Sequence, residues 1–350
     1  MSIRLPARGL SVLAVTFLLA AGAPQSAQAQ DFVLKFGTLD SPQSIIGKGQ
    51  KWYLDRVEEL SKGKVKFEPY WSSSLVPSRQ LLDALKSGIS DVSFLIPGYY
   101  PGKLPLLTVA TLPTTYSDAY TFGKAMSDLV AATPEIREQL AKWGARYLVS
   151  QPFPPYNLLS RAPVKSVADM KGLKVRAFGA QAKLMKRLGA VPVGIPTPEV
   201  YTSLQRGTID AASYPPLLIV DFKLHEVAKH FWAQPLASNT SLLAIRLKTW
   251  DKLPPEVQQA FDQAAAENHA AYHRIVQVEG NEGSAREAFK KAGVAISPGS
   301  QAATDTIDKH TAPIWEEWIQ DMEKKGLPGR RVAETFAAAL AKASKEVPGR

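Results

Sequence analysis

Short segments of alternating hydrophobic and polar residues are separated by amphipathic stretches along most of the chain. The alternation predicts strands at residues 31–37, 63–71 and 90–96. Apolar stripes with helical spacing predict helices at 49–60 and 77–86, the second ending at Gly88. Strands that alternate with helices indicate an α/β protein with a largely parallel sheet and ligand-binding loops at the strand ends.

The same rhythm recurs in the second half of the chain. The predicted strands are 172–178, 191–195 and 209–212, and the predicted helices are 181–188 and 199–205. No low-complexity linker separates the two units, so the chain crosses between them in ordered segments. A helical pattern runs from 254 to about 292, and a helix this long and this late is suited to brace both halves.

The N-terminus has the features of an export signal. Arg4 and Arg8 precede an apolar run at 10–21, and Ala27 and Ala29 provide small residues for cleavage after Ala29. The rival interpretation is a membrane anchor, but the run is shorter than the roughly 20 residues that span a bilayer. No later stretch approaches a membrane span, so we expect an exported chain without direct membrane insertion.

Composition narrows the possible chemistry. The 350 residues include no cysteine, which excludes disulfides, thiol nucleophiles and thiolate metal sites. The formal net charge is +10, but the basic residues are spread along the chain and interleaved with acidic ones. Nucleic-acid binding needs a clustered basic stripe, so we expect no nucleic-acid partner and a mild attraction for small anions.

Motifs of the common enzyme classes are absent. The chain has no G-x-S-x-G, P-loop or H-E-x-x-H sequence, and a secreted hydrolase with unrecognised carboxylates remains the alternative function. His269 and His273 lie one helical turn apart, which suits a metal only if a third ligand converges. We interpret them as surface histidines on an alanine-rich helix and predict no metal site and no cofactor.

Arg176 ends the strand predicted at 172–178, where α/β proteins place their ligands. Its guanidinium offers a planar fork of donors that matches a carboxylate, which a lysine cannot reproduce. The residues alone leave a second hypothesis open, an inter-lobe salt bridge to a glutamate.

Three blocks, at 168–176, 188–193 and 198–210, together resemble the DctP-type solute receptors of tripartite ATP-independent periplasmic (TRAP) transporters. The resemblance implies a two-lobed, type II-like periplasmic-binding-protein fold with mixed sheets flanked by helices. It implies a receptor, not an enzyme, that captures a small organic acid and delivers it to membrane permease subunits. The alternative to a permease is a sensor protein, to which the receptor would signal that its ligand is bound. In the family, the arginine at the position of Arg176 pairs with the ligand carboxylate.

The resemblance also implies lobe boundaries. We expect residues 30–152 plus about 241–282 in lobe I, and 153–240 plus about 283–350 in lobe II. Crossings are expected near Phe153, near Asn239 and through the long helix. Asn239 either hydrogen-bonds the ligand or caps a strand.

The chain departs from the family pattern in the predicted pocket. Tyr214 replaces an asparagine that often faces the ligand, and no second arginine stands near Pro155. Ser213 and Tyr214 replace the Glu-Trp pair of a branch that binds 2-oxo acids with sodium, which argues against that metal site. The candidate aromatic residues are Tyr214, Tyr156, Phe178, Tyr99, Tyr100 and Trp71. They favour a monocarboxylate with an apolar or aromatic body. Core packing is the alternative for each ring, and the pattern favours it more for Phe178 and Trp71 than for Tyr214 and Tyr156.

Overall fold

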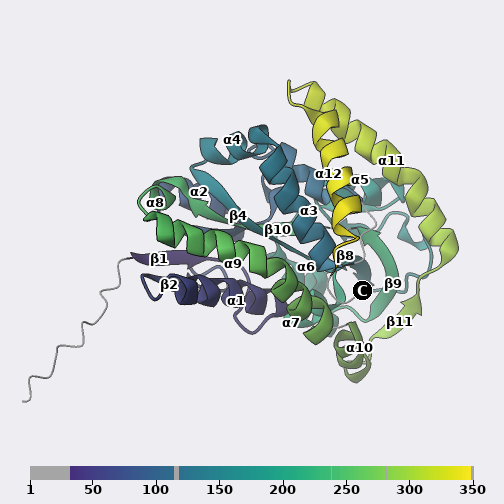
Figure 1. Ribbon diagram of the computed structural model, residues 1–350. Helices are drawn as coiled ribbons and strands as arrows, with labels where there is room; N and C mark the ends of the chain where they lie inside the picture. Colours follow the sequence, from purple (N-terminus) through teal and green to yellow (C-terminus); the bar gives the residue numbers. More distant parts are fainter. Residues whose placement is uncertain (1–31, 114–117, 238, 281, 348–350) are drawn as a thin grey trace, which may run out of the picture.

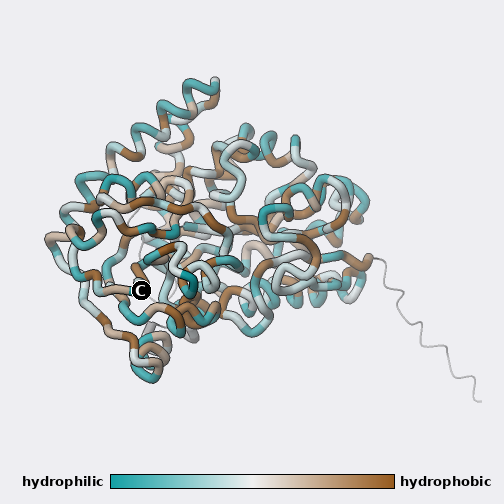
Figure 2. The backbone as a smooth tube through the Cα atoms, turned by 180° about the vertical axis from the view of Figure 1, so that it is seen from behind, coloured by the Kyte–Doolittle hydropathy of each residue, from teal (hydrophilic) through white to brown (hydrophobic). Residues whose placement is uncertain are grey.

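The computed structural model describes residues 32–113, 118–237, 239–280 and 282–347. The predicted signal peptide, residues 1–29, lies outside this part of the chain. Two β-sheets flanked by helices form the molecule (Figure 1). Hydrophobic segments run through its middle, and hydrophilic segments follow its outer loops and helices (Figure 2).

The first sheet has the strand order β2-β1-β3-β10-β4. Its strands are β1 (Phe32–Gly37), β2 (Val65–Tyr70), β3 (Val92–Leu95), β4 (Ala145–Pro152) and β10 (Thr240–Arg246). The helices of this half are α1 (Ile45–Leu60), α2 (Leu81–Ser87), α3 (Ala119–Ala132), α4 (Pro134–Lys142) and α8 (Leu247–Trp250). Strands β1, β2 and β3 are parallel and β10 is antiparallel to its neighbours, so the sheet is mixed.

The second sheet has the order β11-β9-β5-β8-β6-β7. Its strands are β5 (Tyr156–Ser160), β6 (Lys174–Arg176), β7 (Val191–Val193), β8 (Ala211–Tyr214), β9 (His230–Ala237) and β11 (Ala295–Pro298). Its helices are α5 (Gly179–Arg187), α6 (Val200–Arg206) and α7 (Pro216–Asp221). Strand β6 lies parallel between β7 and β8, which places its carboxyl end at the centre of this part of the sheet.

The chain crosses between the sheets in adjacent segments. It leaves the first sheet after β4 and returns between β9 and β10. The two crossings are joined because the Phe153 N–H donates to the Asn239 carbonyl oxygen at 3.1 Å. Both predicted crossing points therefore lie side by side.

The long helix predicted at 254–292 is not continuous. It consists of α9 (Pro255–His273), a π-helical turn (Arg274–Glu279) and α10 (Glu282–Lys291). Helix α9 packs along α1 and α3, whereas α10 packs against α7 (Figure 1). At the break, a Cβ on Gly280 would lie 2.6 Å from the Ile45 side chain. The predicted helix is therefore interrupted, although its segments contact helices of both halves.

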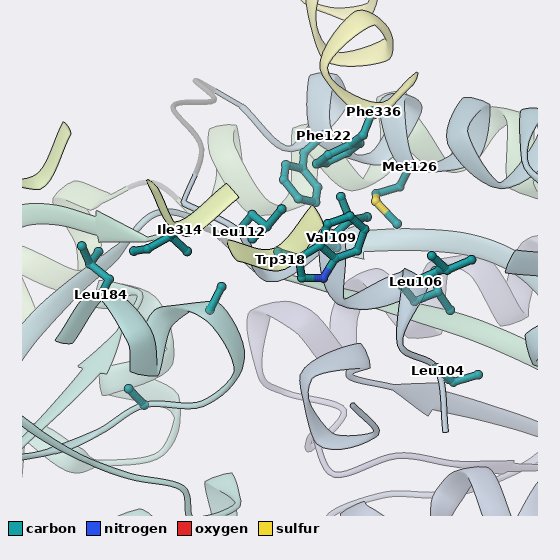
Figure 3. Close-up of a cluster of buried hydrophobic side chains, with 14 of the residues drawn as sticks. Leu104, Leu106, Val109, Leu112, Phe122, Met126, Leu184, Ile314, Trp318 and Phe336 are labelled. Atoms are coloured by element: carbon teal, nitrogen blue, oxygen red, sulfur yellow. The ribbon is translucent and has the colours of Figure 1, made fainter. Parts of the chain in front are cut away.

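Two C-terminal helices, α11 (Gln301–Glu323) and α12 (Gly329–Ala343), pack across both halves. Phe336 of α12 meets Phe122 of α3 at a ring distance of 5.4 Å (Figure 3). Trp318 of α11 donates to the Thr108 hydroxyl at 2.8 Å. The predicted lobe boundaries stay a prediction, and these contacts argue for counting α12 with the first lobe.

Candidate functional site

Arg176 is the last residue of β6, and the neighbouring elements fix its position. Val175 is fully buried between β7 and β8, so the strand continues the sheet up to Arg176. The chain then turns through Phe178 into α5, which begins at Gly179 with a φ of +60°. This geometry brings the arginine to the carboxyl end of a parallel strand, where α/β proteins bind ligands.

The Arg176 guanidinium is buried without an acidic partner. Its residue exposure is 1%, and no described Asp or Glu forms an ion pair with it. Nε donates to the Ile195 carbonyl at 3.2 Å, and Nη2 lies 3.3 Å from both the Tyr99 and the Thr197 hydroxyl oxygens. Nη1 has no hydrogen-bond partner among the described residues. The alternative hypothesis, an inter-lobe salt bridge from Arg176 to a glutamate, therefore has no counterpart in the described part of the chain.

A buried cation without an anion is costly, because desolvation is not repaid by an ion pair. Two aromatic rings reduce this cost in part. The guanidinium carbon lies 4.6 Å from the Phe178 ring centroid and 4.4 Å from that of Tyr214. The free Nη1 group beside these rings is a donor suited to an incoming carboxylate.

Three hydroxyl groups surround the Nη2 end of the guanidinium. The Thr197 hydroxyl lies 2.8 Å from that of Tyr214 and 3.2 Å from that of Tyr99. The Thr197 N–H also donates to the Tyr99 oxygen at 3.1 Å. Burial raises the pKa of Tyr214 well above its ordinary value, so its phenol stays protonated and able to donate.

The site is built from both halves of the molecule. Tyr99 and Gly98 belong to the 3₁₀ turn Pro97–Tyr99, which follows β3 of the first sheet. A Cβ on Gly98 would lie 2.5 Å from the Phe178 ring, so the two halves meet closely here. The Tyr99 and Phe178 rings pack edge to face at 5.1 Å. Residues of both halves therefore form the surroundings of Arg176.

The structure brings five of the eight predicted residues together: Arg176, Phe178, Tyr99, Tyr214 and Tyr156. Tyr156 joins through its ring, which stacks on Tyr214 at 6.2 Å with an interplanar angle of 25°. Tyr156 also packs edge to face against Phe153 of the crossing segment. These contacts form a continuous aromatic wall from the crossing to the guanidinium.

The other three predicted residues have separate partners. Tyr100 donates its hydroxyl to the Ser78 carbonyl at 2.9 Å within the core, and Trp71 packs edge to face on Phe36 at 5.7 Å. The Asn239 side chain accepts the N–H of Thr240 at 2.8 Å, which is the strand-capping alternative. No described contact joins any of the three to Arg176.

Sequence reasoning missed two buried polar residues, of which Thr197 contacts Arg176 directly. Thr197 follows β7, the neighbour of β6, so the rule that selected Arg176 applies to it as well. Asp40 follows β1, is 1% exposed and accepts a 2.7 Å hydrogen bond from Gln50. Burial raises the Asp40 pKa to about 7. An isolated aspartate in a loop gives no sequence signal of such burial.

The histidine pair also differs from the prediction. His269 is buried beside Tyr120 rather than exposed, and burial lowers its pKa to about 4. His273 lies 4.0 Å from Asp118, a long separation for an ion pair. No group of three or more His, Cys, Asp or Glu side chains in the described part of the chain is arranged to hold a metal. Nor does that part contain a helix long and apolar enough to cross a membrane.

Comparison with known proteins identifies the family. The model of bacterial extracellular solute-binding protein family 7 (DctP) matches residues 36–321. A monocarboxylate 2-oxoacid-binding periplasmic protein of Nostoc sp. is 28% identical over 77% of this chain and 74% of its own length.

Two solved structures support the same assignment. A TRAP solute binding protein from Rhodoferax ferrireducens in complex with copurified benzoate has a TM-score of 0.82 and 28% identity, covering 89% of this chain and 98% of the other. A TRAP solute binding protein from an unidentified marine microbe, specific for aromatic acid ligands and bound to 3-hydroxybenzoate, has a TM-score of 0.81 and 25% identity, with 89% and 98% covered. The predicted two-lobed fold is confirmed, and the chain belongs to the DctP family of extracellular solute-binding proteins.

Proposed function

We propose that this protein is a periplasmic receptor for an aromatic monocarboxylate, which it delivers to the membrane permease subunits of a TRAP transporter. The observation that carries the proposal is the buried Arg176 guanidinium, which has aromatic neighbours and no ion pair with a carboxylate of the described residues. An entering carboxylate supplies the missing charge, and its ring packs against Phe178 and Tyr214.

The composition of the site favours one carboxylate over two. Among the described residues of the aromatic wall and hydroxyl cluster, Arg176 is the one buried basic side chain. A second carboxylate, or the several hydroxyls of a sugar acid, would be buried against rings without matching donors. Two structural relatives carry benzoate and 3-hydroxybenzoate, and this chemistry agrees with the aromatic wall.

Binding proceeds without covalent chemistry. In an open arrangement the Arg176 guanidinium is hydrated, and closure buries it together with the ligand carboxylate. The ligand shifts the population toward the closed state because it binds that state more tightly. The relatives are receptors, and the secreted-hydrolase alternative predicts a product that the receptor does not make.

A thermal-shift screen tests the proposal. Benzoate, 3-hydroxybenzoate, pyruvate, succinate and a sugar acid are compared, with benzamide as the neutral control for benzoate. At a ligand concentration of 100 times Kd, we expect benzoate to stabilise the fold by about 2.7 kcal/mol. Benzamide should give no shift, and the benzoate should be recovered unchanged. A larger shift with succinate or the sugar acid, or none with any monocarboxylate, contradicts the proposal.

Export is the second part of the proposal. Cleavage after Ala29 leaves a mature chain that begins at Gln30. Intact-mass analysis of protein from the periplasmic fraction should give the mass of residues 30–350. The mass of the full chain, or recovery in the membrane fraction alone, contradicts this part.

A further inference from the structure

Arg79 connects the two halves of the molecule at the rim of the site. It belongs to the 3₁₀ turn Ser78–Gln80, between β2 and α2 of the first half. Its Nη2 donates to the Gly194 carbonyl oxygen at 3.0 Å, and Gly194 directly follows β7 of the second sheet. The bond therefore spans the division between the halves.

Two arginines, one from each half, hold the same short loop. Arg79 binds the carbonyl of Gly194, and Arg176 binds the carbonyl of the next residue, Ile195. Tyr99 lies between the two cations: the Arg79 guanidinium carbon is 5.4 Å from its ring centroid, and its hydroxyl oxygen accepts from Arg176. Arg79 is exposed and Arg176 is buried, so Arg79 covers the outer side of the site.

The contacts of Arg79 within its own half are few. Across the described residues its one hydrogen bond is the bond to Gly194, and it takes part in no ion pair. The cation–π contact of its guanidinium with the Tyr99 ring is the other interaction described for Arg79. A side chain that serves local folding would bond to its own half, whereas this bond is made to the other half and would break if the halves separated.

We propose that Arg79 is a clasp residue that holds the closed state and slows ligand release, separately from carboxylate recognition by Arg176. This inference rests on the proposed function, since it concerns release from the same site. A residue that stabilises only the closed state lowers the dissociation rate constant. A rim cation that merely attracts anions would raise the association rate constant, and salt would screen that effect.

Release kinetics distinguish these possibilities. Bound benzoate is displaced by excess 3-hydroxybenzoate in a stopped-flow experiment at low salt and at 0.5 M salt. Because a single hydrogen bond of a solvent-exposed side chain is removed, Arg79→Ala should raise the dissociation rate constant about three- to tenfold at both salt concentrations. Arg79→Lys keeps the charge but loses the planar fork, so it should recover less than half of this change on a logarithmic scale. Lys309→Ala, which removes a charge from an exposed residue of α11, is the control and should match the wild type.

An unchanged dissociation rate constant in Arg79→Ala would overturn the proposal that Arg79 holds the closed state. So would an effect confined to association that disappears at 0.5 M salt, because it would assign Arg79 to attraction of the ligand. Failure of the protein to bind any carboxylate contradicts the proposed function instead.

If the protein binds no carboxylate, the role of Arg79 in holding the closed state can still be tested without a ligand. The chain has no cysteine, so Asp55→Cys and Gln205→Cys introduce the only two thiols for spin labels, one on α1 and one on α6. In this labelled background, Arg79→Ala should lower the closed fraction of the distance distribution about three- to tenfold relative to the open fraction. Identical distributions with and without Arg79 would overturn the proposal.

Discussion

Replacing Arg176 by methionine separates recognition of the ligand from stability of the fold. Methionine keeps a long, unbranched, apolar side chain in the space between Phe178 and Tyr214, but it removes the cation. The substitution eliminates three hydrogen bonds, to Ile195, Tyr99 and Thr197, all of whose oxygens are neutral. No described carboxylate loses its partner.

The structure sets the expected magnitude. Loss of one member of a buried, hydrogen-bonded charge pair costs about 2 to 5 kcal/mol, so Kd for benzoate should rise about 30- to 5,000-fold. Arg176→Lys keeps the charge but cannot serve the three protein oxygens and a carboxylate at once. It should recover less than about tenfold of the lost affinity. The ligand-free unfolding midpoint of Arg176→Met should equal or exceed that of the wild type, because no described ion pair is lost and the closed state no longer buries a cation without an anion.

Titration calorimetry with benzoate measures Kd for the three proteins, and differential scanning calorimetry without ligand measures their unfolding midpoints. We expect Arg176→Met to fold normally and to lose most of its affinity for benzoate. A Kd of Arg176→Met within threefold of the wild type would refute the reasoning. A large fall in the ligand-free midpoint would instead assign Arg176 a structural role.

Three further predictions follow from neighbouring groups. Thr197→Val removes the hydroxyl shared by Tyr99 and Tyr214, so calorimetry should show Kd for benzoate raised about fivefold, and an unchanged value contradicts this. The folded Asp40 pKa of about 7 exceeds its ordinary 3.8, so its stabilising contribution is present at pH 4 and lost toward pH 7. In urea unfolding, the stability of Asp40→Asn should therefore fall less than that of the wild type between pH 4 and pH 7. Parallel stability profiles of the two proteins would contradict this prediction. The folded His269 pKa of about 4 lies below 6.5, so its contribution is lost as pH falls from 6.5 to 4, and His269→Gln should be less sensitive to acid over that interval.

The local sequence patterns correctly predicted the strand and the helix that position Arg176. Alternation located β6 and its position relative to α5, and the strand-end rule selected Arg176. The same patterns did not reveal strands β9 and β10. Nearly every residue of β10 is buried, so it shows no polar alternation, and its antiparallel partners are distant in sequence.

Long-range packing explains the remaining differences. Tyr99 and Tyr100 are adjacent in sequence, yet one hydroxyl reaches Arg176 and the other a carbonyl in the core. The direction of the backbone in this turn determines which tyrosine faces Arg176. The amino-acid composition of the turn does not reveal that direction. Arg79 acts through a carbonyl oxygen 115 residues away, so no local motif marks it. The break after α9 likewise coincides with a close approach of Gly280 to Ile45, a residue distant in sequence.

The central claim is that Arg176 receives the ligand carboxylate, and a crystal structure of the protein with benzoate tests it most directly. We predict a carboxylate oxygen about 3 Å from Arg176 Nη1, with the benzoate ring against Phe178 or Tyr214. Benzoate bound with its carboxylate directed away from Arg176, or Arg176 paired with an acidic side chain of the protein, would contradict the account.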